Sequence, residues 1–152
     1  MTKKTPSPSF PVPAAAHALP LRIGGVTPTA RKIGANTALF RQGDATFGMF
    51  RLVTGRIRLV RVTPDGAQVP MHTVRCGEFF AEASIFSDQY HCDAIAVQDC
   101  ELQVYAKAAL AEEFKRNSEE LWMFAGQLAQ RVQGLRSRLQ IRQIRSARER
   151  VM

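Results

Sequence analysis

The hydrophobic pattern of the first two thirds of the chain is that of short β-strands. "FRLVTGRIRLVRV" (50–62) has Gly55 between two apolar stretches. The second stretch alternates apolar residues with arginines, namely Ile57, Leu59 and Val62 against Arg56, Arg58 and Arg61. This near-alternation is typical of a half-buried strand.

Turn signals separate the strand-like stretches. Asp65-Gly66 lies in "TPDGAQ" (63–68) and predicts a hairpin, because both residues tolerate a positive φ. "VPMHTV" (69–74) is then the returning strand, and "AIAVQDCELQVY" (94–105) predicts two short strands around Asp99. Strands of this length and spacing predict an antiparallel β-barrel or sandwich rather than a parallel sheet.

The period changes to a helical one after Tyr105. "KAALAEEFKRN" (107–117) predicts one helix, and Ser118 is a candidate cap for a second helix. The second helix carries apolar residues at alternating spacings of four and three: Leu121, Ala125, Leu128, Val132, Leu135 and Leu139. This is the seam of a coiled coil.

A helix from Ser118 to Arg150 would be about 50 Å long, which exceeds a small barrel. The seam therefore predicts a homodimer through a second copy of the helix. The alternative is a helix that lies across its own barrel and buries the same stripe there.

Length and charge set the domain organisation. The chain has 152 residues and a formal charge of +8, which suits one domain with a modest core. We expect a disordered tail over 1–20, a β-barrel with flanking helices over 21–117 and a dimerisation helix over 118–152. No apolar run is long enough to cross a bilayer, and prolines interrupt any secretory signal.

Two further features each have two interpretations. The segment 131–152 holds seven arginines and one acidic residue, so it is either a polyanion-binding surface or a solvated helix face. Cys76, Cys92 and Cys100 lack zinc spacing. They indicate reduced thiols of a cytoplasmic protein, with a redox or haem role as the minor alternative.

The order of these motifs resembles the cyclic-AMP receptor protein/FNR (Crp/Fnr) superfamily of bacterial transcription regulators. The similarity runs from Leu39 to Met152 and rests on five short motifs: "FRQGD" (40–44), "TGRI" (54–57), Asp65-Gly66, "GEFFAE" (77–82) and "SARERV" (146–151). It implies an α+β fold, with a jelly-roll β-barrel of the cyclic-nucleotide-binding type followed by a long dimerisation helix.

The resemblance also assigns a ligand pocket. Residues 77–94 match the family's phosphate-binding cassette without a gap, so Glu82 takes the position of the ribose-binding Glu and Ala94 that of the cassette Ala. Cys92 replaces the phosphate-binding Arg, Asp93 replaces a hydroxyl residue, and Ala81 replaces a Gly. The expected pocket residues are Phe80, Ala81, Glu82, Ala83, Ser84, His91, Cys92, Asp93, Ala94, Leu135 and Arg136.

These replacements predict a pocket that has lost its grip on a cyclic phosphate. A hydrogen bond to a charged group contributes roughly 1.5–3 kcal/mol, so its loss costs about ten- to hundredfold in affinity. Asp93 is expected to add repulsion near the phosphate. Leu135 and Arg136 stand where the family has a Thr and a Ser that contact the base. His91 is either a weak substitute donor or an exposed loop residue.

The sequence therefore predicts an effector-sensing and dimerisation domain of a Crp/Fnr-type regulator, with a small-molecule effector as its ligand. DNA contact would need the helix-turn-helix domain that follows "SARERV" in the family and that these residues do not include; whether the chain is a fragment or a naturally short protein stays open. The alternatives are the regulatory domain of a channel or kinase and a ligand-free dimerisation module. No cofactor, metal site or enzymatic activity is expected, with haem as a minor alternative.

Overall fold

The computed structural model describes residues 25–151, which form two compact units. One unit comprises residues 26–110 and contains every strand; the other comprises Gly25 and residues 111–151. The predicted tail over 1–20 lies outside the described residues.

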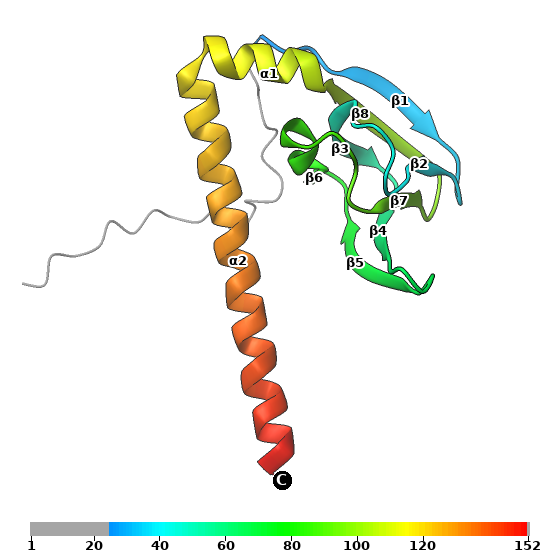
Figure 1. Cartoon of the computed structure of the whole chain (residues 1–152), viewed down its shortest axis with the longest axis vertical. Coiled ribbons are helices and arrows are strands. Elements are labelled where there is room, and N and C mark those ends of the chain that lie inside the picture. The colour runs from blue at the N-terminus through cyan, green and yellow to red at the C-terminus, as the bar shows by residue number, and fades with distance from the viewer. Residues whose placement is uncertain (1–24, 152) are drawn as a thin grey trace, which may run out of the picture. The chain divides into compact units, whose positions relative to one another are not determined.

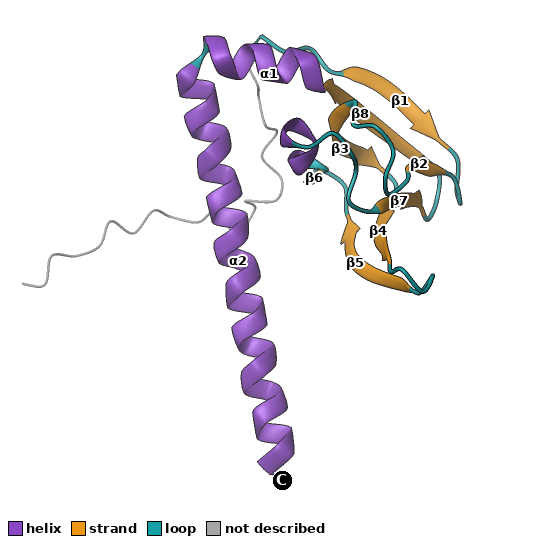
Figure 2. Cartoon of the chain, viewed as in Figure 1, coloured by secondary structure: helices purple, strands orange, loops and turns teal. Residues whose placement is uncertain are grey.

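Two antiparallel four-stranded sheets make up the first unit (Figures 1 and 2). One sheet has the order β1 (Thr29–Ile33), β8 (Cys100–Ala106), β3 (Gly48–Thr54) and β6 (Phe79–Phe80). The other has the order β2 (Ala38–Phe40), β7 (Asp93–Ala96), β4 (Ile57–Val62) and β5 (Gln68–Val74). The predicted antiparallel β fold is confirmed.

The core lies between the two sheets. Both sheets contribute buried side chains to a single cluster: Ile33, Leu39, Phe40, Phe50, Leu52, Ile57, Val74, Phe80, Tyr90, Ala94, Ala96, Cys100 and Leu102. Phe40 stacks on Tyr90 with ring centroids 3.8 Å apart and on Phe50 at 5.6 Å. The stack joins β2, β3 and the segment before β7, so aromatic contacts hold both sheets to the segment between η1 and β7.

The turn between β3 and β4 requires a glycine. Gly55 has a φ of +99°, and a Cβ there would lie 2.5 Å from the carbonyl oxygen of Asp99 and 2.6 Å from Sγ of Cys100. Any side chain would therefore collide with the turn before β8. The predicted hairpin at Asp65-Gly66 is also present, with Gly66 at a φ of +85° between β4 and β5.

Two helices follow the strands: α1 (Lys107–Arg116) and α2 (Ser118–Val151). The sequence placed the cap of α2 at Ser118, and this is wrong, because Oδ1 of Asn117 accepts the N–H of Glu120 at 3.4 Å. Within the second unit Phe114 packs on Phe124 with ring centroids 5.0 Å apart. No helix in residues 25–151 is long and apolar enough to span a bilayer.

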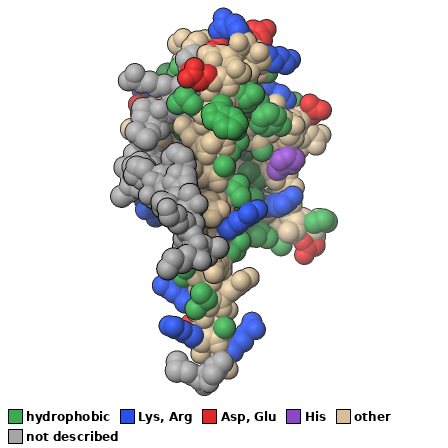
Figure 3. All heavy atoms as spheres, turned by 90° about the vertical axis from the view of Figure 1, so that its left-hand side faces the viewer, with side chains coloured by type: hydrophobic (Ala, Val, Ile, Leu, Met, Phe, Trp, Pro, Cys, Tyr) green, Lys and Arg blue, Asp and Glu red, His purple; other side chains and the backbone are tan. Residues whose placement is uncertain are grey.

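Lys and Arg side chains flank the C-terminal part of α2 (Figure 3). Seam residues Val132, Leu135 and Leu139 are 46%, 56% and 58% exposed on the single chain. The apolar stripe of this helix therefore remains largely open to solvent.

A buried carboxylate ties three strands together at one end of the second sheet. Asp93, 4% exposed, begins β7, and its Oδ1 accepts the backbone N–H of Gln42 at 2.7 Å. Its Oδ2 lies 3.4 Å from Nη1 of Arg41. The Gln42 side chain in turn donates to the carbonyl of Val62 at 3.1 Å and accepts the Val62 N–H at 2.9 Å. Asp93 thus links the end of β2 to β7 directly and to β4 through Gln42.

We expect Asp93→Ser to lower the free energy of unfolding by about 2 kcal/mol, because a charged hydrogen bond to Gln42 is lost in a buried place. Asp88→Ser is the matched control, since Asp88 is exposed and lies 3.9 Å from Lys107; it should change stability by less than about 0.5 kcal/mol. Chemical denaturation of both variants measures the difference. Equal stability of the two variants would contradict the role given to Asp93.

Candidate functional site

The predicted cassette runs from β6 through a short 3-10 helix, η1 (Glu82–Phe86), to β7. Ser84 is 3% exposed, and its hydroxyl donates to the carbonyl of Gly48 at 2.9 Å. The hydroxyl of Tyr90 donates to the same carbonyl at 3.0 Å. The cassette is thereby fixed to the start of β3 by its own side chains.

Ala81 precedes η1 in the left-handed region, with a φ of 63° and a ψ of 31°. A residue with a Cβ loses roughly 1–2 kcal/mol there relative to the usual helical region. This conformation gives a backbone reason for the Gly that the resemblance implies at this position. The chain keeps the cassette's backbone turn although its side chain has changed.

The expected pocket residues separate into core and surface groups. Phe80 and Ala94 lie in the core, and Ala81 and Cys92 pack against it. Glu82 is half-buried, while Ala83 and His91 are exposed. Leu135 and Arg136 are exposed residues of α2 in the other unit.

The Asp93 carboxylate does not point into the cassette's concave face. Asp93 pairs with Val60 on β4, whereas the next pair, Ala94 with Leu59, belongs to the core side. Because side chains alternate between the faces of a sheet, Asp93 projects from the opposite face toward Gln42. The expected repulsion between Asp93 and a bound phosphate is therefore reduced. The carboxylate stabilises the fold instead.

The Cys92 thiol stands where the family has its phosphate-binding Arg. Burial raises its pKa, and the Asp93 carboxylate raises it further, while the Arg61 guanidinium lowers it. The thiol is thus predominantly protonated at neutral pH, which makes it a poor nucleophile and a poor metal ligand. All three cysteines are free thiols, and residues 25–151 contain no group of three or more His, Cys, Asp or Glu suited to a metal ion.

The pocket residues expected from the sequence did not include Arg61 of β4. Arg61 has the same parity along the strand as Ile57 and Leu59, which contact the core, although its own side chain is exposed. Val60, the preceding residue, is 1% exposed and lies on the opposite face of the strand. The alternation of the strand places Arg61 on this side, but nothing local marks it as a site residue.

A His–Glu pair lies on the same face. His72 pairs with Leu59 across β4 and β5, and its Nε2 is 2.8 Å from Oε2 of Glu78. The Glu78 side chain is 17% exposed, so the pair is partly screened from water. The concave face therefore carries a His–carboxylate pair and one arginine near the Cys92 thiol.

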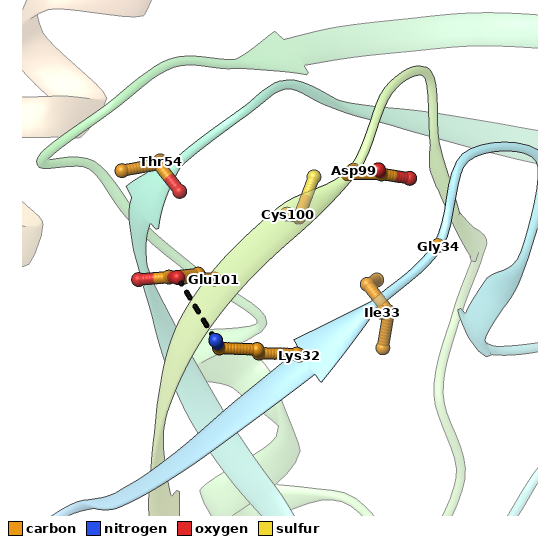
Figure 4. Close-up of a pocket in the computed structure, with 7 residues that line it drawn as sticks. All are labelled: Lys32, Ile33, Gly34, Thr54, Asp99, Cys100 and Glu101. Carbon is orange, nitrogen blue, oxygen red and sulfur yellow. Dashed lines mark ion pairs between the residues drawn. The ribbon is translucent and has the colours of Figure 1, made fainter.

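A separate hollow of about 450 Å³ lies at the ends of β1, β3 and β8 (Figure 4). Its charged groups are engaged within the protein: Lys32 lies 3.5 Å from Glu101, and Oδ1 of Asp99 accepts the N–H of Ala35 at 2.9 Å. None of its lining residues belongs to the cassette. We therefore take as the candidate site the cassette and the adjoining core-facing side of β4 and β7, called the concave face below.

Comparison with solved structures identifies the fold. The sensor domain of the transcriptional regulator DNR from Pseudomonas aeruginosa superposes with a TM-score of 0.63 and 21% identity, over 73% of this chain and 75% of that one. The Thermus thermophilus catabolite activator protein gives a TM-score of 0.64 and 23% identity over 75% of this chain. This chain spans 54% of the catabolite activator's length.

A third similar structure is the c-di-GMP responsive global regulator CLP of Xanthomonas campestris, with a TM-score of 0.63 and 19% identity over 70% of this chain and 53% of that one. No curated protein sequence matches the chain. The fold is thus that of Crp/Fnr-type regulators, as the motifs predicted. The sequence profile of the cyclic nucleotide-binding domain matches residues 30–117, and the chain belongs to that family.

Proposed function

We propose that the chain is the effector-sensing and dimerisation module of a cytoplasmic Crp/Fnr-type transcription regulator, and that its pocket binds cyclic AMP weakly. The observation that carries the proposal is Cys92, a half-buried neutral thiol in the position of the phosphate-binding Arg. DNA recognition is assigned to a helix-turn-helix domain of the regulator rather than to this segment.

Three features support a weak cyclic-nucleotide site in an intact frame. The left-handed turn at Ala81 and the Ser84–Gly48 hydrogen bond keep the cassette in shape. Glu82 is the residue type that the resemblance assigns to the ribose hydroxyl, a contact that contributes about 1 kcal/mol in water. The phosphate, however, meets no cation at position 92. Affinity for a nucleotide depends on the charged contact far more than on the ribose contact.

Cyclic AMP and cyclic GMP should therefore bind the unaltered chain with dissociation constants well above the micromolar range. Cys92→Arg should improve binding at least about tenfold, because it returns a charged donor to the cassette. Asp93 is kept in this variant, since its carboxylate is bonded to Gln42. Isothermal titration calorimetry measures both proteins.

Cys76→Arg is the control, because it adds the same charge at an exposed thiol outside the cassette helix. It should leave the affinity unchanged. Micromolar binding by the unaltered chain, or an equal gain in the two variants, would contradict the weak-site proposal.

Dimerisation is proposed from α2 taken by itself. Its apolar seam residues recur at coiled-coil spacing and stay exposed on the single chain. An unpartnered apolar stripe of this length favours association with a second copy. An effector that changed how the two helices meet would alter the spacing of attached DNA readers.

Leu135→Arg should convert the dimer to a monomer at micromolar concentration, since it places a charge in the seam. Gln130→Arg adds the same charge on the outward side of the heptad and should leave the dimer intact. Sedimentation velocity distinguishes the two. A monomeric unaltered chain, or dissociation by both variants, would contradict the seam.

A ligand-free dimerisation module is the second candidate. The internal hydrogen bonds of Ser84, Tyr90 and Asp93 favour it, because they stabilise the cassette without an effector. Calorimetric titration with candidate effectors separates the two functions, since a purely structural module binds none of them.

A further inference from the structure

The register of β4 and β7 brings a cation beside the position that lacks one. Leu59 pairs with Ala94 and Val60 pairs with Asp93. Arg61 is the next residue of β4, and Cys92 comes immediately before β7. Because side chains alternate along a strand, Arg61 follows the side of Leu59. That side faces the core, because Leu59, Cys92 and Ala94 all contact the core.

Electrostatics agrees with this placement. The Arg61 charge acts directly on the Cys92 thiol. Within residues 25–151 Arg61 makes no salt bridge or side-chain hydrogen bond, while the nearby carboxylates are engaged: Asp93 by Gln42 and Arg41, and Glu78 by His72. Arg61, whose guanidinium has five N–H donors, is therefore not paired with a carboxylate of these residues.

The surface around Arg61 is apolar. On β5 the residue opposite Arg61 is Val69, which is 46% exposed, and Leu59 lies on the same face two residues earlier. A guanidinium beside one exposed and one half-buried apolar side chain suits a ligand that has both a charged group and an apolar body. If only water and salt ions neutralised the Arg61 charge, the apolar side chains beside it would stay exposed to solvent.

We propose that Arg61 is the anion-binding residue of this pocket, and that it receives the phosphate or carboxylate of a small organic effector from β4 instead of β7. The inference rests on the proposed function, in which the concave face is an effector site. It explains how a cassette without its arginine would still accept an anion. Because adjacent strands are about 5 Å apart, the charge is held one strand away from the cyclic-phosphate position, which favours a ligand of different shape.

The Cys92 thiol provides a probe that does not require the effector to be known. In a Cys76→Ser background Cys92 is the accessible thiol, since Cys100 is 2% exposed. Its reaction rate is measured with an anionic aromatic disulfide, 5,5′-dithiobis(2-nitrobenzoate), and with the neutral 4,4′-dithiodipyridine. Changes in the thiol pKa affect both rates, so their ratio isolates attraction of the anion.

Arg61→Gln should lower the anionic-to-neutral rate ratio at least about threefold at low salt. Arg58→Gln is the matched control: it removes the same charge from the same strand, but Arg58 lies on the opposite face and should leave the ratio unchanged. Inorganic phosphate and acetate, added separately at constant ionic strength, should slow only the anionic reagent and only when Arg61 is present. The stronger competitor identifies the anion that the site prefers.

Equal ratios in the Arg61 and Arg58 variants would overturn the assignment. Failure here is distinguishable from failure of the proposed function. Weak cyclic-AMP binding is measured on Cys92→Arg and the unaltered chain, and it can hold whether or not Arg61 attracts an anion.

Discussion

The buried carboxylate of Asp93 is the interaction on which the candidate site depends. It accepts the Gln42 N–H at 2.7 Å, and the Gln42 side chain holds both backbone groups of Val62. A charge with 4% exposure needs such partners, because an unpaired buried carboxylate is strongly destabilising. One side chain therefore fixes the end of β2, the start of β7 and the end of β4, which together frame the concave face.

This arrangement changes what the cassette can do. Ser84 and Asp93 occupy cassette positions, yet Ser84 is bonded to the backbone of β3 and Asp93 to the backbone of the loop after β2. Side chains held by internal hydrogen bonds are not free to turn toward a ligand, so we expect neighbouring residues to contact it. Arg61 and the His72–Glu78 pair supply polar groups beside the cassette, whereas Cys92 supplies only a neutral thiol. This difference is the basis for our proposal that the site receives an anion other than a cyclic phosphate.

Local signals in the sequence predicted the fold well. Asp65-Gly66 and Gly55 marked real turns, and the change of period after Tyr105 marked the two helices. Long-range contacts could not be predicted, because Asp93 and Gln42 are 51 residues apart and nothing local links them. Arg61 was not among the expected pocket residues, because an arginine in an alternating strand carries no local sign of a pocket.

Amide hydrogen exchange at Gln42 tests the central claim that the fold itself holds this frame without a ligand. The Gln42 N–H lies outside the strands, so only its bond to the buried Asp93 carboxylate can slow its exchange. In the ligand-free chain the account predicts protection similar to that of amides within β7, and its loss in Asp93→Ser. Exchange at the rate of an open loop in the unaltered chain would contradict it.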